Sequence, residues 1–207
     1  MAEKLMERSC IEFADALAAK ISVPGGGGAA AYAGALGVAL GNMTANFTTG
    51  KKKYAEYEED IQRIIAEGDV IRAKLIDLVF EDAEAFEPLS KAYAIPKEDP
   101  SRDGVMEEAT KNALAAPLEM MRQIAKAIEL LEELNVKGSK MLISDVACGA
   151  VLCSAAMRAA ALNVFINTKS LLDRDLAAKL EAECDELLAY VPRAKAVADE
   201  ITDYIRV

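Results

Sequence analysis

The sequence predicts an all-α fold, a single domain over residues 1–207 built as a bundle of five to seven helices. Apolar residues recur at helical spacing along most of the chain, and no segment alternates as a strand does. About one residue in five is Ala, aromatic residues make up 5% and Trp is absent, which favours closely packed helices over a sheet. No repeat or linker divides the chain.

The first predicted helix covers about residues 10–20. A capping box opens it, because Ser9 is followed three residues later by Glu12. Pro24 then interrupts the helical pattern, since the residue before a proline avoids helical backbone angles. Four consecutive glycines, 25–28, come next. Because glycine is a poor helix former, we expect them to form a loop that leads into the second helix.

Two of the predicted helices are rich in small residues, and we expect both to be buried. The first follows the glycines and ends near residue 49, and the second covers about 144–167. The stretch 21–50 has no charged residue, but its glycines and few large aliphatic residues do not suit a bilayer, so we expect no membrane span. Small residues on one face let a second helix approach closely. In the first of these helices they are Gly34, Gly37 and Gly41.

Helical spacing also predicts three further helical regions, which cover about residues 56–93, 102–134 and 173 to the end. Gly68 and Pro88 predict a bend or break in the first of them, and Pro117 predicts a kink in the second. The last region is expected to break at Pro192.

The charge and the missing histidine exclude several classes of function. Lys and Arg number 24 and Asp and Glu number 34, which gives a formal net charge of −10 and argues against nucleic acid as a partner. The absence of His excludes Ser-His-Asp and Cys-His catalysis and His-ligated zinc. A general acid or base near neutral pH must then be Asp, Glu, Lys, Tyr or Cys.

The cysteines and the N-terminus favour a cytoplasmic protein. The segment 1–8 is charged throughout and has no apolar stretch, so we expect no signal peptide. No two cysteines form a C-x-x-C pair. We therefore expect buried free thiols at Cys10, Cys148, Cys153 and Cys184.

Four glycines in a row exceed what a turn requires. They lack the Lys-Ser/Thr of a phosphate-binding loop and the preceding strand of a dinucleotide-binding loop. We expect Gly25, Gly26 and Gly27, together with Pro24, to line a ligand site. The alternative is that they serve packing alone.

A basic cluster follows the uncharged helix. Lys51, Lys52 and Lys53 stand next to each other in an acidic chain, and we expect them at the mouth of the same pocket, where they suit an anionic small molecule. The ring of Tyr54 could stack on a flat ligand. The alternative is an ordinary solvated surface.

Two carboxylates are candidates for acid/base catalysis. Asp82 lies on the apolar line of its helix, three or four residues from Leu78, Val79 and Phe86, and burial there would raise its pKa towards neutrality. Surface exposure is the alternative. Asp145 stands near the start of the second small-residue helix, where a helix dipole also favours a carboxylate for purely structural reasons.

Five segments then match family motifs in chain order. Residues 23–31 resemble P-G-G-G-S-x-A-A, with Gly28 where Ser is usual, and residues 50–54 resemble G-[KR]-[KR]-x-[YF]. Residues 82–86 are similar to D-A-x-A-F, 144–145 to S-D and 163–167 to N-V-x-I-N. Together they resemble the formimidoyltetrahydrofolate cyclodeaminase / methenyltetrahydrofolate cyclohydrolase family over almost the whole chain.

The resemblance implies an all-helical homodimer, a folate substrate, and no metal or redox cofactor. It implies a carboxylate acid/base at Asp82, with Asp145 as a second polar group. Lys51 and Lys52 would then meet the carboxylates of the folate glutamate tail. The residues expected to contact substrate are Pro24, Gly25, Gly26, Gly27, Lys51, Lys52, Tyr54, Phe86, Ser144, Asn163 and Asn167.

Two reactions fit the resemblance, and the cyclohydrolase is the expected one. It hydrolyses 5,10-methenyltetrahydrofolate to 10-formyltetrahydrofolate, whereas the cyclodeaminase releases ammonia from formiminotetrahydrofolate. Deaminases are often fused to a transferase domain, and the sequence given has none, which favours the cyclohydrolase. A folate-binding or helical scaffold protein without catalysis is the alternative of another class.

Overall fold

The computed structural model describes residues 5–206, and within them the chain forms seven α-helices, two short 3₁₀ segments and no strand. This confirms the predicted all-α bundle. Residues 1–4, which begin the segment in which we expect no signal peptide, and residue 207 lie outside the described part. The elements are α1 (Cys10–Ala18), α2 (Gly26–Asn46), η2 (Lys52–Tyr57), α3 (Glu58–Ala92), α4 (Arg102–Lys137), η3 (Lys140–Leu142), α5 (Ile143–Thr168), α6 (Arg174–Leu188) and α7 (Tyr190–Ile205).

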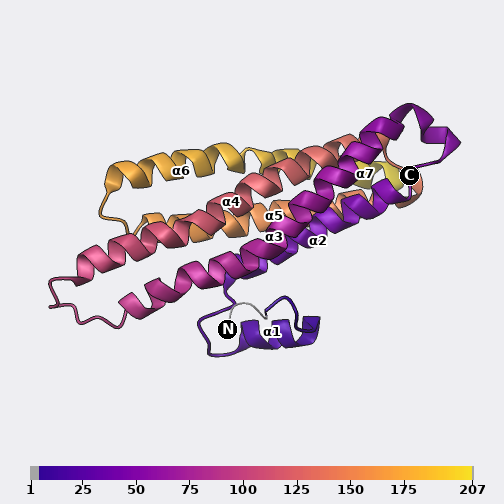
Figure 1. The fold of residues 1–207 in the computed structure, drawn as a ribbon. Coiled ribbons are helices and arrows are strands. Elements are labelled where there is room, and N and C mark those ends of the chain that lie inside the picture. Colours follow the sequence, from indigo (N-terminus) through magenta and orange to yellow (C-terminus); the bar gives the residue numbers. More distant parts are fainter. Residues whose placement is uncertain (1–4, 207) are drawn as a thin grey trace.

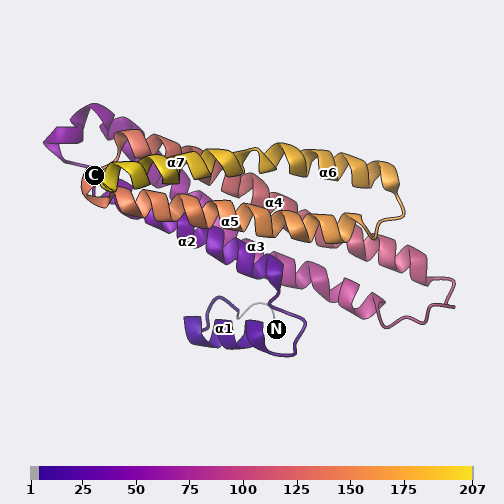
Figure 2. The same cartoon turned by 180° about the vertical axis from the view of Figure 1, so that it is seen from behind.

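Four long helices form the body of an elongated bundle. α2 packs against α3 on one side and α5 on the other, and α4 packs against α3 and α5. Figure 1 shows α3 and α4 towards the viewer, and Figure 2, from behind, shows α5 and α2 in front, with α6 and α7 along α5. The short α1 lies below the bundle in both views.

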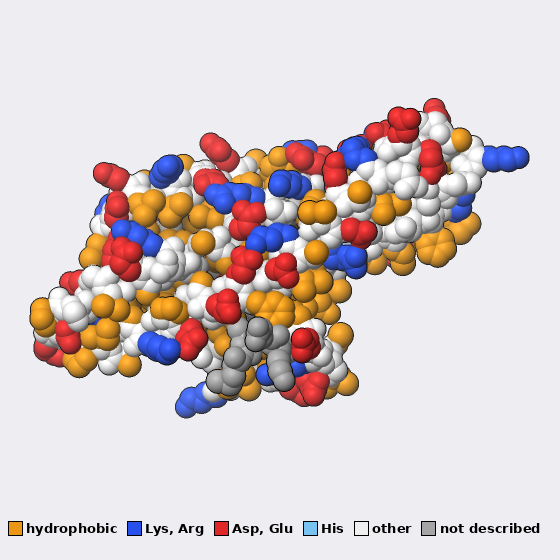
Figure 3. Space-filling model, viewed as in Figure 1, with side chains coloured by type: hydrophobic (Ala, Val, Ile, Leu, Met, Phe, Trp, Pro, Cys, Tyr) orange, Lys and Arg blue, Asp and Glu red, His pale blue; other side chains and the backbone are white. Residues whose placement is uncertain are grey.

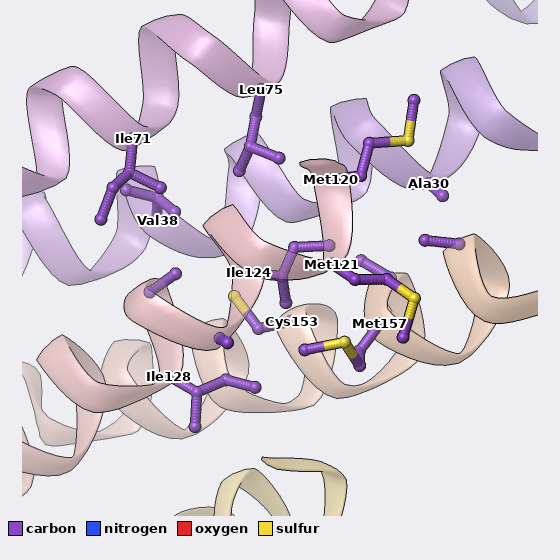
Figure 4. Close-up of a cluster of buried hydrophobic side chains, with 14 of the residues drawn as sticks. Ala30, Val38, Ile71, Leu75, Met120, Met121, Ile124, Ile128, Cys153 and Met157 are labelled. Carbon is purple, nitrogen blue, oxygen red and sulfur yellow. The ribbon is translucent and has the colours of Figure 1, made fainter. Parts of the chain in front are cut away.

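The core is aliphatic and rich in methionine. Figure 4 shows Met121 and Ile124 of α4 between Leu75 of α3 and Met157 of α5, and all four side chains are fully buried. Close packing of α2 on α5 depends on small residues. A Cβ on Gly37 would lie 2.9 Å from the backbone oxygen of Gly149, so the two backbones touch there. The inner faces of both small-residue helices are buried, as predicted.

The helix α2 begins earlier than predicted. Gly26, Gly27 and Gly28 lie inside its first turn, with Gly25 as the N-cap, and the expected glycine loop is wrong. The first amides of a helix need no intrahelical partner, and Gly27 and Gly28 are buried. Tertiary packing thus outweighs the poor helix propensity of glycine.

Prolines interrupt the helices less than predicted. α3 runs without a break through Gly68 and Pro88. The chain breaks between α6 and α7 at Ala189 rather than at Pro192. Pro192 stands in the first turn of α7, where its missing N–H costs no intrahelical bond.

Two of the four cysteines are not buried. Cys153 and Cys184 lie in the core, and burial raises the pKa of the Cys153 thiol to about 12. The expectation of burial is wrong for Cys10, which opens the short α1, and for Cys148, which lies on the outer side of α5.

One segment of the described chain, Lys140–Thr168, is long and apolar enough to cross a membrane by length and composition. Nearly all of it is α5, which packs against α2, α4 and α7. Its apolar composition therefore serves the core of this bundle along its inner side.

The face formed by α3 and α4 is charged. Figure 3 shows Lys and Arg side chains interspersed with Asp and Glu side chains over it. Arg63 lies 2.7 Å from Glu133, and Lys137 lies 2.8 Å from Asp60. These side chains are half-buried, and such pairs near the surface each add little stability. The mixed charges make this face soluble.

Candidate active site

A cavity of about 190 Å³ lies at the N-terminal end of α2, where α2, α3, α4 and α5 meet. Among the described residues that line it, Asp82 is the one ionisable side chain. Within residues 5–206, no group of three or more His, Cys, Asp or Glu side chains is arranged to hold a metal ion. The lining comprises Ser22, Val23, Gly25, Gly26, Gly27, Asp82, Phe86, Ala113, Pro117, Asn163, Ile166 and Asn167.

Asp82 is half-buried on α3 and faces the first turn of α2. Burial raises its pKa to about 6, and the backbone amide of Gly28 opposes that shift by hydrogen bonding to the carboxylate. The positive end of the α2 dipole acts in the same direction as that amide. Asp82 is therefore poised to exchange a proton near neutral pH.

The glycines of this turn give the carboxyl group its room. A Cβ on Gly27 would lie 2.6 Å from the carboxyl carbon of Asp82, which no side chain could accommodate without movement. Gly26 has a looser neighbour, since its Cβ would lie 3.5 Å from Nδ2 of Asn163. That nitrogen donates to the Ala159 carbonyl at 2.8 Å, so the amide oxygen of Asn163 is the acceptor a ligand can use.

Apart from Ser22 and Asn167, the remaining walls are apolar. Phe86, Ala113, Pro117 and Ile166 present hydrocarbon surface that suits a flat ring. A second cavity of about 320 Å³ shares Ser22, Val23 and Phe86 with the first. It extends along α3 to Lys91, which forms an exposed ion pair with Glu87 at 2.8 Å.

The predicted site residues fall into two groups at opposite ends of the bundle. Asp82 lies beside the start of α2, whereas Lys51 and Lys52 follow its end. At 1.5 Å per residue, the 21 residues of α2 separate them by about 30 Å. The expectation that these lysines lie at the mouth of the Asp82 pocket is wrong for a single chain.

Ser144 and Asp145 belong to the lysine end. They stand in the first turn of α5, which runs antiparallel to α2, and Thr44 near the end of α2 donates a hydrogen bond to the Leu142 carbonyl at 3.3 Å. Asn163 and Asn167, near the other end of α5, line the cavity. Asp145 therefore does not share the Asp82 cavity within one chain.

Tyr54 is buried and makes its contacts within the chain. Its hydroxyl accepts a hydrogen bond from the backbone amide of Lys140 at 3.0 Å, and the Lys53 ammonium lies 5.5 Å from the ring centre. The amide of Lys140 lowers the pKa of Tyr54 by stabilising the phenolate. Its ring is not available to stack on a ligand, contrary to the prediction.

Pro24 also departs from its predicted role. It is buried beneath the glycine turn, next to Gly28, and does not line the cavity. The prediction also missed five residues that do line it: Ser22, Val23, Ala113, Pro117 and Ile166. Of these, Ile166 lies inside the N-V-x-I-N segment, which is the one signal in the sequence that points to it. Pro117 is apolar, and its residue type predicts a kink rather than a chemical role.

Comparison with known proteins fits this geometry. The family model described as formiminotransferase-cyclodeaminase matches residues 9–186. The chain belongs to the formiminotransferase-cyclodeaminase family. The resemblance inferred from the five motifs is thus confirmed, and both ends of the bundle lie within the matched region.

Relatives in this family carry two different names. The chain is 40% identical over 181 residues to the methenyltetrahydrofolate cyclohydrolase of Methylorubrum extorquens, covering 86% of this chain and 87% of that protein. It is 29% identical over 190 residues to the formimidoyltransferase-cyclodeaminase of Sus scrofa, covering 90% of this chain but 35% of that longer protein.

A solved structure in the family has the same fold. The crystal structure of formiminotetrahydrofolate cyclodeaminase from Thermotoga maritima superposes with a TM-score of 0.90 at 32% sequence identity. The match covers 98% of this chain and all of that one. Family membership thus accounts for the seven-helix architecture and leaves the choice of reaction to the chemistry of the site.

Proposed function

We propose that the protein is a methenyltetrahydrofolate cyclohydrolase, which converts 5,10-methenyltetrahydrofolate and water to 10-formyltetrahydrofolate. The observation that carries this proposal is Asp82, a half-buried carboxylate in an apolar cavity, with a pKa of about 6. The 40% identity with the cyclohydrolase of Methylorubrum extorquens supports the choice of reaction.

The substrate is a cation whose charge is shared between N5 and N10 across the bridging carbon. A carboxylate in an apolar cavity stabilises such a cation, and the flat ring of the pterin suits the hydrocarbon walls around Phe86 and Pro117. The oxygen of Asn163 can accept a hydrogen bond from the pterin. These groups bind and orient the reacting carbon next to Asp82.

The hydrolysis requires one group that accepts a proton in the first step and donates it in the second. In its ionised form Asp82 accepts a proton from water as the oxygen bonds to the bridging carbon, which gives a neutral carbinolamine. The bond from that carbon to N5 then breaks, Asp82 returns its proton to N5, and the hydroxyl proton leaves to solvent. Asp82 ends as the carboxylate, so no cofactor is required, and we propose none.

A second candidate is the cyclodeaminase. The likeness to the Thermotoga maritima cyclodeaminase, at a TM-score of 0.90, favours it specifically. In that reaction N10 attacks the formimino carbon, and ammonia leaves with a donated proton. Protonated Asp82 could donate that proton, because a pKa near 6 leaves both of its forms accessible.

Two assays on the purified full chain separate these reactions. Methenyltetrahydrofolate absorbs in the near ultraviolet, so its loss reports hydrolysis, and ammonia released from formiminotetrahydrofolate reports deamination. The cyclohydrolase proposal predicts rapid loss of absorbance above the uncatalysed rate. Release of ammonia with no acceleration of hydrolysis would assign the deaminase instead. A folate-dependent thermal shift without turnover in either assay would indicate a binding protein.

We further propose a cytoplasmic homodimer that binds neither nucleic acid nor membrane. The net charge of −10 supports the first exclusion, and the free thiols support a reducing compartment. Sedimentation of the purified protein measures its oligomeric state directly.

A further inference from the structure

We propose that the cavity of about 320 Å³ beside the Asp82 cavity binds the aminobenzoyl-glutamate half of the folate, and that Lys91 contacts a carboxylate of its glutamate. That this ligand is a folate rests on the proposed function. The proposal concerns residues of one chain, which lie on α3 and on the segment before α2.

The Asp82 cavity is too small to hold a whole folate. Its volume is about 190 Å³, whereas sites for ligands of this size usually measure roughly 300–1,000 Å³. Together, the two cavities fall within that range. They share Ser22, Val23 and Phe86, so a ligand that extends beyond the first cavity at these residues enters the second.

An apolar passage joins the two cavities. Phe86 of α3 and Val23 of the segment before α2 line both of them, and both residues are half-buried. In a folate the aminobenzoyl ring is bonded directly to N10, next to the bridging carbon. With that carbon beside Asp82, the ring therefore lies at this passage, where burial against hydrocarbon and against the ring of Phe86 stabilises it.

The second cavity follows α3 towards its C-terminal end. Ala83, Glu87 and Ser90 are spaced by four and three residues and so share one face of the helix. This face adjoins the one that carries Asp82 and Phe86. Ser90 is half-buried, and its hydroxyl can donate a hydrogen bond to the amide carbonyl or to a carboxylate of the ligand.

Lys91 is the one cation among the described residues that line the two cavities. Its ammonium lies 2.8 Å from the Glu87 carboxylate, one turn back towards Asp82. At 1.5 Å per residue, Glu87 and Lys91 stand about 8 and 14 Å beyond Asp82 along the helix axis. Standard bond lengths separate the bridging carbon of a folate from its glutamate carboxylates by roughly 10 Å. The tail is thus long enough to bring a carboxylate to this ammonium.

Arg102 reduces the repulsion of an anion by the C-terminal end of α3. The last carbonyl groups of a helix carry a partial negative charge, which opposes a carboxylate nearby. The guanidinium of Arg102 donates hydrogen bonds to the carbonyl oxygens of Ala92, at 3.4 Å, and of Ile95. This positive charge offsets the negative end of the helix next to Lys91.

Glu87 and Lys91 should act on the tail in opposite directions. In the free protein they form an exposed pair four residues apart, which holds the ammonium weakly. A carboxylate of the tail is attracted by Lys91 and repelled by Glu87, so Glu87 limits the binding that Lys91 provides. An ordinary surface pair, which is the alternative, has no effect on ligand binding.

The first test measures binding to the purified full chain by calorimetry. The ligands are tetrahydrofolate and tetrahydropteroate, which lacks the glutamate. We expect Lys91→Gln to weaken binding of tetrahydrofolate about two- to fivefold and Glu87→Gln to strengthen it by a similar factor. Neither variant should change the binding of tetrahydropteroate. Lys97→Gln is the matched control and should bind both ligands as the wild type does, because Lys97 is exposed and lines neither cavity.

The proposed subsite is overturned if the wild type binds the two ligands equally, or if Lys91→Gln weakens binding of both or of neither. A shift in the same direction for Glu87→Gln and Lys91→Gln overturns it as well. So does a loss in Lys97→Gln that equals the loss in Lys91→Gln, because the effect would then come from net charge.

A second test locates the tail by protection of a thiol. In a background with Cys10→Ser and Cys148→Ser, Ser90→Cys should be labelled by a disulfide reagent, and saturating tetrahydrofolate should slow that labelling severalfold. Lys97→Cys in the same background is the control and should be labelled at the same rate with and without the ligand. Equal rates for Ser90→Cys with and without tetrahydrofolate overturn the placement of the tail.

The results distinguish failure of the subsite from failure of the proposed function. Rapid hydrolysis of methenyltetrahydrofolate with no effect of Lys91→Gln on binding rejects the subsite and supports the cyclohydrolase. The expected binding pattern without turnover in either folate assay supports the subsite and rejects the enzyme. A wild type that does not bind tetrahydrofolate overturns both.

Discussion

The carboxyl group of Asp82 on α3 lies against Gly27 in the first turn of α2, so closely that a Cβ on Gly27 would come within 2.6 Å of its carboxyl carbon. This contact joins two features that the sequence presents far apart, a run of glycines and an acid on an apolar helix line. Because Gly27 has no side chain, the carboxyl group of Asp82 fits against the first turn of α2 and lies half-buried there.

Gly27→Ala should therefore displace the Asp82 side chain. We expect a loss of at least tenfold in kcat/KM, together with about 1–3 kcal/mol of stability, the usual cost of overpacking. Gly104→Ala is the matched control, because nothing lies within 4 Å of a Cβ there. Thermal unfolding and the absorbance assay measure the two effects. A fully active Gly27→Ala would contradict the importance of this contact.

Asp82→Asn keeps the shape of the side chain and removes its proton exchange. General acid–base catalysis contributes about 10²- to 10⁴-fold, so we expect a fall of at least 100-fold in kcat on methenyltetrahydrofolate. Glu84→Gln, two residues along on the exposed side of α3, should retain wild-type activity. Circular dichroism must show both variants folded. Activity near that of the wild type in Asp82→Asn would reject the assignment.

The sequence predicts most of the helices and the position of Asp82, because both follow from the spacing of residues along a helix. The 3.6-residue period marked every long helix, and Ser9 and Glu12 form the predicted capping box. The period also set Asp82 on a buried line, since the direction of a side chain on a helix follows from spacing alone. The bounds of α2 were missed because burial of Gly27 and Gly28 overrides their propensity.

The sequence does not predict how the motifs lie relative to one another in space. Helical periodicity predicts which face of its own helix a residue occupies, but not which end of a neighbouring antiparallel helix it contacts. The sequence therefore predicts one pocket for Lys51 and Asp82, whereas the pairing of α2 with α3 puts them at opposite ends of α2. Tyr54 was misjudged for a related reason, because its partner, the amide of Lys140, is 86 residues away in the chain.

Activity should depend on pH through Asp82. The proposed hydrolysis uses the carboxylate as a base, and its pKa of about 6 means that the ionised fraction rises between pH 5 and 7. We expect kcat to rise with an apparent pKa near 6 and to reach about a tenth of its plateau at pH 5. Initial rates are measured after subtraction of the uncatalysed reaction. A flat profile across this range would argue against Asp82 as the base.

The thiols should react in the order of their burial. Cys10 is exposed and should be labelled quickly by a disulfide reagent, whereas Cys153 and Cys184 should react only on unfolding, since burial raises their pKa to about 12 and about 11. Cys148 is also exposed, on the outer side of α5, and should be labelled quickly as well. Labelling is followed by mass spectrometry. Labelling of Cys153 or Cys184 in the folded protein as fast as that of Cys10 would contradict their burial.

Stability should also vary with pH at this one residue. Because the folded-state pKa of Asp82 is raised from 3.8 to about 6, the folded state holds its proton more tightly than the unfolded state. Stability therefore falls as pH rises from about 4 to about 6 and stays lower above that range, by about 1–3 kcal/mol. Asp82→Asn has no carboxyl group at this position, so its free energy of unfolding should not fall over this pH range. The difference in free energy of unfolding between Asp82→Asn and the wild type should therefore rise by about 1–3 kcal/mol between pH 4 and pH 7.5 in favour of the variant. Urea unfolding at one protein concentration measures it. A difference that stays constant with pH would mean that the carboxyl group is not desolvated in the folded protein.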